Sequence, residues 1–381
     1  MRVQKPTQLL KSYLARQYAK LYPRDIYVGV TGSVGKTTCV QSCKAVLSQK
    51  FSTITTESNL DYPNSFQSTL LRLRPKTKKV ILEMGMNFKG QMDFYLSLIH
   101  PKIMVVTKIS NFNCEYLGGI DEIYEEVAKG IRQLDEKGFA ILNFDDPYSR
   151  KMAKDCRGQV IYFGTDPQNC TIWAGNIKVE DFRTTFELNL GVERMKINLP
   201  LLGSHQVYPV LAAAAVGIVN GVTLTKIKIG LESLNVLEHR MQTLLGPSNS
   251  IIIDDTMNSS PADLEAAIDT LLQVSARRRI LVLGEMPNLG KYSEELHRQI
   301  AQKIYKEKID LCFLGLGDTE IIASELKSLG FWEERLSINL QNSQMVSKLL
   351  KTLGKGDVVL VKGASAQRLD EVVKRVAKKT N

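Results

Sequence analysis

The feature that most constrains this chain is a glycine-rich turn placed between an apolar strand and a helix. The strand is expected over 26–30, and the segment from Gly29 to Thr38 reads GVTGSVGKTT. Gly32 and Gly35 allow the main chain to bend so that its N–H groups point toward an anion. The first turn of the following helix adds its positive end. The segment therefore predicts a phosphate-binding loop.

The loop also predicts how ATP and Mg²⁺ would be held. Lys36 is expected to meet the β and γ phosphates, and the Thr37 hydroxyl to reach Mg²⁺. Glu83 ends a second apolar strand, where a carboxylate beside the loop is well placed for Mg²⁺; the alternative is an ordinary surface glutamate. The spacing departs from GxxxxGK[ST], because Gly29 lies one position too far upstream. The expected ATP-binding residues of the loop are Gly32, Ser33, Val34, Gly35, Lys36, Thr37 and Thr38.

Strands and helices alternate along the chain, which predicts an α/β protein with parallel sheets covered on both faces. Short alternating strands over 159–200 predict an antiparallel extension of the first sheet, and the pattern of strands and helices restarts after residue 237. We expect an N-terminal amphipathic helix (1–24), a P-loop ATPase-type domain (25–236) and a Rossmann-like domain (237–381). The other expected core elements are strands over 80–82, 103–106, 139–142, 251–253, 280–283, 311–314 and 358–361, and helices over 120–134 and 208–219.

Composition narrows the class of protein. A chain of 381 residues is too long for one ordinary domain. The net charge of +10 is spread along the sequence, with no long basic run and interleaved aromatics of the kind that would favour nucleic acid. Six cysteines without a CxxC pair and four histidines argue against a structural zinc site. We find no transmembrane segment and no secretory signal, so a cytoplasmic location is expected.

The start of the chain predicts an amphipathic helix over about residues 5–22. We expect this helix to pack on the following domain, and contact with a membrane surface stays open as an alternative. Its apolar side is expected to consist of Leu9, Leu10, Tyr13, Leu14, Tyr18 and Leu21.

Several further blocks follow the loop in a fixed order. They are 56–59 (TESN), 83–85 (EMG), 203–206 (GSHQ), 240–241 (RM), 254–261 (DDTMNSSP), 283–286 (LGEM) and 362–365 (KGAS) with Arg368. Together with the loop, they resemble the Mur ligase family, and its D-alanyl-D-alanine-adding MurF type most closely, over residues of about 25–375.

The resemblance implies ATP-dependent amide bond formation. A carboxylate attacks the γ phosphorus to form an acyl phosphate, ADP leaves, and an amine then displaces phosphate. A second domain that closes over the site would keep water from the acyl phosphate. Arg240 and Asp255 can instead be ordinary ion-pair residues of the domain junction. The implied roles are catalysis by Lys36, Glu83 and Arg240; nucleotide binding by His205, Arg240, Asp255 and Asn258; and substrate binding by Asn59, Lys362 and Ser365.

Three departures from the family pattern concern the second metal ion and the adenine. Asn113 stands where the family has a metal-binding histidine, and Val127 where it has a carbamylated lysine. Lys129 lies two positions on, about 200° round a helix, so Val127 should face inward and Lys129 outward. An insertion would restore Lys129 as the carbamate. We therefore expect one well-formed Mg²⁺ site, at Thr37 and Glu83, and a weak second one. Pro209 and Met257 replace an asparagine and a tyrosine near the adenine.

The acceptor substrate stays open at the level of sequence. MurF-type enzymes have an N-terminal domain that holds a UDP-sugar, and the lead before Gly29 is too short to form one, since chains below about 40 residues seldom fold alone. Either a partner protein holds the UDP-sugar or the acceptor is another acidic molecule. Three hypotheses remain: a ligase that adds an amino acid or a D-Ala-D-Ala-like dipeptide to a cell-wall precursor peptide, a ligase of the same mechanism for folate polyglutamate or an amino-acid polymer, and a non-catalytic nucleotide-binding subunit.

Overall fold

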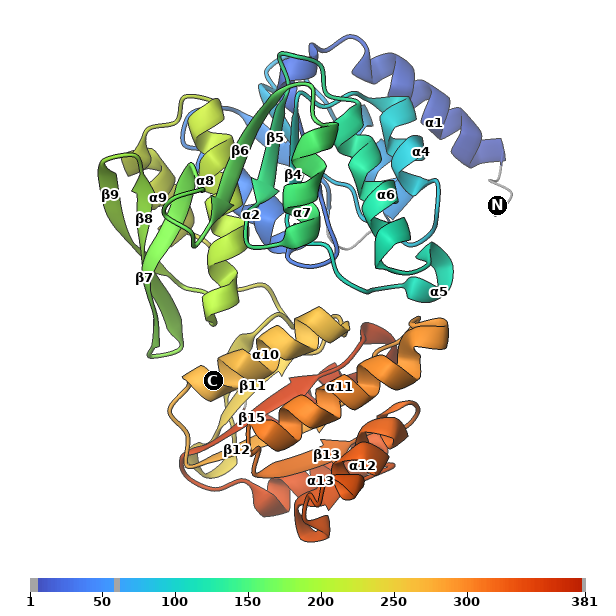
Figure 1. Cartoon of the computed structure of the whole chain (residues 1–381), viewed down its shortest axis with the longest axis vertical. Coiled ribbons are helices and arrows are strands. Elements are labelled where there is room, and N and C mark those ends of the chain that lie inside the picture. The colour runs from blue at the N-terminus through green and yellow to red at the C-terminus, as the bar shows by residue number, and fades with distance from the viewer. Residues whose placement is uncertain (1–5, 58–61, 379–381) are drawn as a thin grey trace.

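The computed structural model describes residues 6–57 and 62–378. They form two lobes, each built on its own sheet, and Figure 1 shows one lobe above the other. Within these residues the first sheet has nine strands, in the order β2-β3-β1-β4-β5-β6-β7-β8-β9. The strands are β1 (Tyr27–Thr31), β2 (Thr53–Thr55), β3 (Lys79–Glu83), β4 (Ile103–Val106), β5 (Phe139–Asn143), β6 (Gln159–Gly164), β7 (Ile172–Glu180), β8 (Arg183–Leu190) and β9 (Glu193–Leu199).

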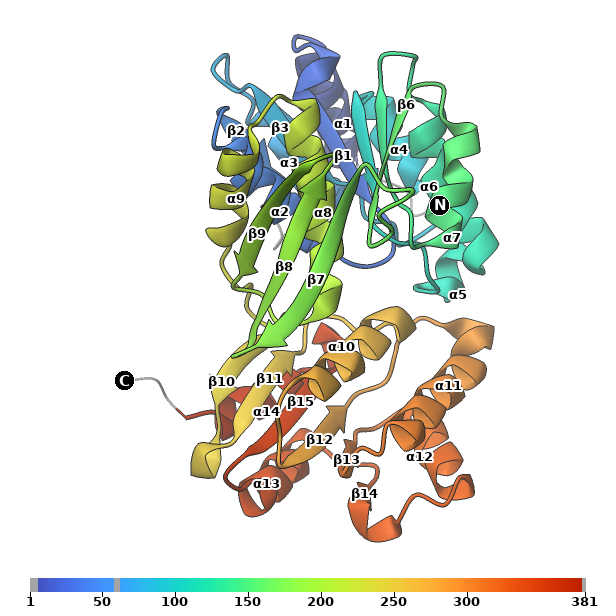
Figure 2. The same ribbon diagram turned by 60° about the vertical axis from the view of Figure 1, so that its left-hand side comes forward.

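The first sheet is parallel from β2 to β7 and antiparallel from β7 to β9. The expected antiparallel extension over 159–200 is therefore wrong for β6, which pairs in parallel with both β5 and β7. The physical reason is the short crossover through α7 (Pro147–Lys151), which returns the chain to the same end of the sheet before β6 begins. Figure 2 shows β7, β8 and β9 lying across α8 (Val207–Val219).

Helices cover both faces of this sheet, and its central strands are therefore buried along their whole length. Val28 and Val30 of β1 pack into one apolar cluster, whereas Val80 and Leu82 of the neighbouring β3 pack into the other. The first cluster is built with α2 (Lys36–Leu47), α8 and α9 (Leu224–Glu232). The second is built with α1 (Pro6–Ala19), α3 (Tyr62–Leu71), α4 (Gln91–Leu98), α5 (Cys114–Leu117) and α6 (Ile120–Arg132).

The second sheet begins after a linker that follows α9. Within the described residues it has six strands, in the order β10-β11-β15-β12-β13-β14, all parallel except β10. Its strands are β10 (Gln242–Leu245), β11 (Ile251–Asp255), β12 (Arg278–Leu283), β13 (Leu311–Leu314), β14 (Leu336–Ser337) and β15 (Asp357–Lys362). Its helices are α10 (Pro261–Gln273), α11 (Ser293–Lys306), α12 (Thr319–Ser328), α13 (Asn342–Thr352) and α14 (Leu369–Val376). This arrangement confirms the α/β fold class.

The N-terminal helix α1 packs on the first domain as expected, but of its expected apolar side only Tyr18 takes part in the contact. Ala15 and Ala19 are buried, and the Tyr18 hydroxyl donates to the Leu73 carbonyl at 3.0 Å. The small side chains of Ala15 and Ala19 let α1 approach α3 closely. The leucines of α1 are exposed to solvent. The apolar residues left exposed are Leu9, Leu10, Tyr13, Leu14 and Leu21. No helix of residues 6–57 and 62–378 is long and apolar enough to cross a membrane.

This orientation predicts that replacing exposed leucines of α1 destabilises the protein less than enlarging the buried Ala15. Replacing both Leu10 and Leu14 with glutamine should change the free energy of unfolding by no more than about 0.5 kcal/mol each, because neither side chain is buried. Ala15→Leu should cost about 1–3 kcal/mol, since Ala15 is 0% exposed and added methylenes would overpack the contact. Urea unfolding followed by circular dichroism measures both changes. A larger loss in the double glutamine variant than in Ala15→Leu would contradict the observed face.

Candidate functional site

The phosphate loop lies at the carboxyl edge of the first sheet, where β1 is flanked by β3 and β4. Gly32 has φ +126°, and a Cβ there would lie 2.3 Å from the Thr107 hydroxyl, so only glycine fits. The Ser33 N–H donates to the Lys108 carbonyl at 2.7 Å. The Thr107 hydroxyl donates to the Val34 carbonyl at 2.6 Å. The segment after β4 therefore holds the loop in its bent conformation before any anion binds.

Lys36 opens α2 and is only 8% exposed. Its ammonium donates to the carbonyls of Gly32 at 3.0 Å and Ser33 at 2.9 Å, and lies 5.2 Å from the centroid of the Phe112 ring. Burial lowers the pKa of Lys36, while the carboxylates of Glu83 and Asp263 act in the opposite direction. A buried ammonium in this position gains electrostatic stabilisation from an added anion such as a phosphate.

Thr37 is the point at which three parts of the chain meet. Its hydroxyl donates to Glu83 Oε1 at 3.2 Å, and Arg240 Nη2 donates to the same hydroxyl at 3.4 Å. Glu83 comes from the end of β3, where it is 6% exposed and its N–H donates to the Thr56 hydroxyl at 3.0 Å. Two adjacent oxygens at the edge of a phosphate loop fit Mg²⁺, which uses few protein ligands and completes its shell with phosphate and water. Among the described residues, no group of three or more His, Cys, Asp or Glu is placed to hold a metal ion.

Arg240 reaches the loop from the linker between the domains. The residues on either side of it, His239 and Met241, both have left-handed backbone conformations, with φ of 61° and 51°. Such conformations cost about 1–2 kcal/mol for residues with a Cβ, so other contacts must hold them. His239 Nδ1 lies 2.8 Å from Asp254 Oδ2, and the Met241 N–H donates to Asp255 Oδ1 at 3.3 Å. The end of β11 thus fixes the turn that presents Arg240.

Asp255 and Lys362 form an ion pair at the carboxyl ends of β11 and β15. They are register partners on these adjacent strands, and Lys362 Nζ lies 2.5 Å from Asp255 Oδ2 and 3.0 Å from the Asn258 carbonyl. Lys362 is 2% exposed. Asn258 and Ser365 are exposed nearby, and the Ser365 N–H donates to the Met257 carbonyl at 3.2 Å. The expected nucleotide-binding aspartate and the expected substrate lysine therefore form one ion pair.

His205 lies at the junction of the two domains, just before α8. Its Nδ1 is 3.2 Å from the Thr270 hydroxyl of α10, and the neighbouring Ser204 N–H donates to Gln273 Oε1 at 3.2 Å. Burial lowers the pKa of His205, which favours the neutral imidazole. The residue therefore joins the first domain to α10, on the same side of the second domain as Asp255.

Asn113 also bridges the two domains. Asn288 Nδ2 donates to Asn113 Oδ1 at 3.2 Å, and the Glu115 N–H donates to the Asn288 carbonyl at 3.0 Å. Asn113 Nδ2 in turn donates to Asn87 Oδ1 at 3.2 Å. An amide that both accepts and donates here suits a domain contact, at a position where the family pattern has a metal-binding histidine.

On α6, Val127 faces the core and Lys129 faces outward, as the helical pattern predicts for these two candidate carbamate positions. Val127 is 0% exposed, whereas Lys129 points outward and pairs with Asp93 at 2.6 Å and Glu126 at 2.7 Å. Burial lowers the pKa of Lys129, but the hydrogen bonds to these two carboxylates outweigh it, so the pKa lies above its usual value. Carbamate formation requires the neutral amine, which this setting disfavours.

We therefore expect Lys129→Ala to reduce the rate of ADP release by no more than about twofold, because the change removes a partly exposed ion pair of small energetic value. The measurement compares steady-state rates of the variant and the wild-type chain. A collapse of the rate that acetate or formate restores would show that Lys129 carries a carbamate after all.

Several residues at the site had no individual role assigned from sequence. Asp263 lies in the first turn of α10, and its charge acts on Lys36 across the domain boundary. Thr56 and Phe112 support Glu83 and Lys36 from loops after β2 and β4. The cap sequence SSPAD at 259–263 marks a helix start, but no sequence signal places that helix opposite the phosphate loop. Asn59, an expected substrate residue, lies outside the described residues.

Comparison with known proteins places these features in a family. Residues 30–217 match the Mur ligase middle domain, and residues 239–365 match the domain described as "Mur ligase, glutamate ligase domain". A UDP-N-acetylmuramoyl-tripeptide–D-alanyl-D-alanine ligase of Buchnera aphidicola subsp. Baizongia pistaciae is 30% identical over 356 residues, covering 92% of this chain and 75% of the relative.

Solved structures agree in fold. MurF from Acinetobacter baumannii superposes with a TM-score of 0.88 at 21% identity, over 97% of this chain and 80% of that one. MurF ligase from Thermotoga maritima in complex with ADP gives a TM-score of 0.84 at 22% identity, over 98% and 84%. The two-sheet architecture is thus shared by both solved proteins.

Proposed function

The chain belongs to the Mur ligase family, and we propose that it joins a carboxyl group to an amine through an acyl phosphate, with release of ADP. The observation that carries the proposal is the contact of Arg240 with Thr37, because it brings a cation of the linker onto the phosphate loop. ATP is the phosphoryl donor. The proposed substrates are a cell-wall precursor peptide with a free carboxylate and D-alanyl-D-alanine, as in the name of the Buchnera relative.

In the first step, a carboxylate oxygen of the acceptor attacks the γ phosphorus of ATP, and the bond to the β-γ bridging oxygen breaks. The attack brings together two anions, so positive groups must surround the γ phosphate. Lys36 and Arg240 supply these charges, and the N–H groups of residues 34–38 bind the phosphate oxygens. When bound at Thr37 and Glu83, Mg²⁺ neutralises further phosphate charge.

In the second step, the amine attacks the acyl carbonyl carbon, the bond between that carbon and the phosphate oxygen breaks, and the amine gives up a proton. Water would destroy the acyl phosphate, so the site must be enclosed. The contacts of Asn113 with Asn288 and of His205 with Thr270 hold the two domains together around the loop. These contacts support an enclosed reaction at the domain boundary.

The test is an ADP-release assay with pairs of acids and amines. We expect release only when ATP, an acceptor such as a UDP-muramoyl tripeptide, and D-alanyl-D-alanine are all present. An acceptor labelled with ¹⁸O in its carboxyl group should transfer one label to the released phosphate. Folate with glutamate, and acidic amino acids alone, serve as the competing substrate classes. ADP release that never depends on an amine, or phosphate without label, would refute the proposal.

A further inference from the structure

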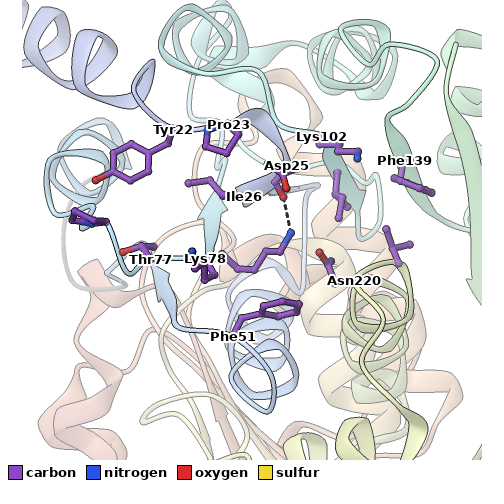
Figure 3. Close-up of a pocket in the computed structure, with 14 residues that line it drawn as sticks. Tyr22, Pro23, Asp25, Ile26, Phe51, Thr77, Lys78, Lys102, Phe139 and Asn220 are labelled. Atoms are coloured by element: carbon purple, nitrogen blue, oxygen red, sulfur yellow. Dashed lines mark hydrogen bonds between the residues drawn. The ribbon is translucent and has the colours of Figure 1, made fainter.

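A cavity of about 530 Å³ opens at the edge of the first sheet opposite to the phosphate loop (Figure 3). Its walls come from the residues just before β1, the starts of β3 and β4, and the segments next to α2 and α8. The phosphate loop follows the other end of β1. Five strand residues span about 16 Å at about 3.3 Å each, so the cavity is separate from the ATP site.

Lysines dominate the polar lining of this cavity, which we call the lysine pocket. Lys78, Lys79 and Lys102 line it, and Asp25 is the one acidic residue among the lining residues of the described chain. Lys79 is 8% exposed, and its ammonium donates to the Asp25 carbonyl at 2.7 Å, the dashed line in Figure 3. Within residues 6–57 and 62–378, the side chains of Lys78 and Lys102 make no hydrogen bond or ion pair.

The charge on Lys79 is only partly compensated. Burial lowers its pKa, the Asp25 carboxylate opposes that change, and the ammonium groups of Lys102 and Lys50 lower the pKa further. Like charges gathered at a buried ammonium raise the free energy of the protein unless an anion offsets them. An anion inside the lysine pocket would therefore be stabilised by several cations at once.

Apart from Thr77 and Asn220, the remaining lining is aromatic and aliphatic. The Phe51 ring lies 5.5 Å from Lys79 Nζ and 5.2 Å from Lys50 Nζ, and it forms one wall of the pocket in Figure 3. Ile26, Ile103 and Phe139 line other parts of the pocket. A site with a few convergent charges and mostly apolar walls selects a ligand that has both an anionic and an apolar part.

We propose that the lysine pocket binds a small phosphorylated molecule whose phosphate lies between Lys79 and Lys102 and whose apolar part contacts Phe51. The site is independent of the ligase reaction, because its residues lie at the amino ends of the strands whose carboxyl ends carry the catalytic groups.

Calorimetric titration with phenyl phosphate tests the proposal, with inorganic phosphate as the reference ligand. All titrations use the Lys36→Ala chain, in which the phosphate loop lacks its buried cation and binds phosphate more weakly. We expect one site for phenyl phosphate, with at least about threefold higher affinity than inorganic phosphate. Adding Lys79→Met and Lys102→Gln should reduce the affinity at least tenfold. The matched control is Lys76→Gln, which removes an exposed lysine of the same loop outside the pocket and should leave binding unchanged.

Methionine keeps most of the length of Lys79, and thermal unfolding checks that each variant is folded. If the Lys79 variant does not fold, Lys102→Gln alone should still reduce affinity at least threefold. Absence of binding to the Lys36→Ala chain would overturn the proposal. Equal effects of Lys76→Gln and Lys102→Gln, or equal affinity for both phosphates, would also overturn it.

Discussion

The Lys36→Ala variant is expected to release ADP about a thousandfold more slowly than the wild-type chain. The Lys36 ammonium is the buried cation of the phosphate loop, held by the carbonyls of Gly32 and Ser33. Removing one group that stabilises developing charge typically costs about 10²–10³ in kcat, and here the lost group carries a full charge. The assay uses saturating ATP, acceptor and amine.

Lys44→Ala is the matched control, because Lys44 lies on the same helix and is exposed. Its rate should stay within about twofold of the wild-type rate. Lys36→Arg should not restore activity, since a planar guanidinium does not replace a compact ammonium in the loop. If Lys36→Ala kept more than a tenth of the wild-type rate, the assignment of the phosphate loop would be wrong.

The second large effect is expected for Glu83→Gln, in the Mg²⁺ dependence of the reaction. Glutamine keeps the size of the side chain and can still accept a hydrogen bond from Thr37, but it removes the negative charge that a divalent cation needs. Removing a group that only hydrogen-bonds to a metal ligand already lowers metal affinity by about 10- to 100-fold, and Glu83 is expected to be a ligand itself. We therefore expect the Mg²⁺ concentration for half-maximal rate to rise at least about tenfold.

The measurement is a Mg²⁺ titration of ADP release at fixed ATP for the wild-type and Glu83→Gln chains. Glu115→Gln, which removes an exposed carboxylate from α5, is the control and should leave the titration unchanged. An unaltered Mg²⁺ titration of Glu83→Gln, with only a lower maximal rate, would remove Glu83 from the metal site and assign it to positioning Thr37.

The part of the candidate site whose local structure followed from the sequence is contiguous along the chain. Gly32, Gly35, Lys36 and Thr37 belong to one turn, whose shape follows from glycine conformations and the adjoining strand and helix. The opposite faces of Val127 and Lys129 were equally predictable, because both follow from the geometry of one helix. Local rules suffice where the interacting groups are close in sequence.

Contacts between distant segments were the part that sequence left open. Arg240 and Asp255 each had two interpretations, as groups for ATP or as ion-pair residues of the junction. The structure brings Arg240 to Thr37 and pairs Asp255 with Lys362. For the α1 helix the prediction of the packing face was largely wrong, because its leucines are exposed while Ala15, Tyr18 and Ala19 make the contact. Periodicity identifies an apolar face, but not which surface of the domain has room for it.

The amino-acid sequence by itself determined that a glycine-rich turn would form between a strand and a helix, because the conformations of two glycines and the start of the helix depend only on about ten neighbouring residues. Only the tertiary structure decided which groups of the second domain face that loop, and that three lysines gather at the opposite edge of the same sheet. Those arrangements depend on how whole sheets pack against helices and against each other, and no local preference of the chain encodes such distances.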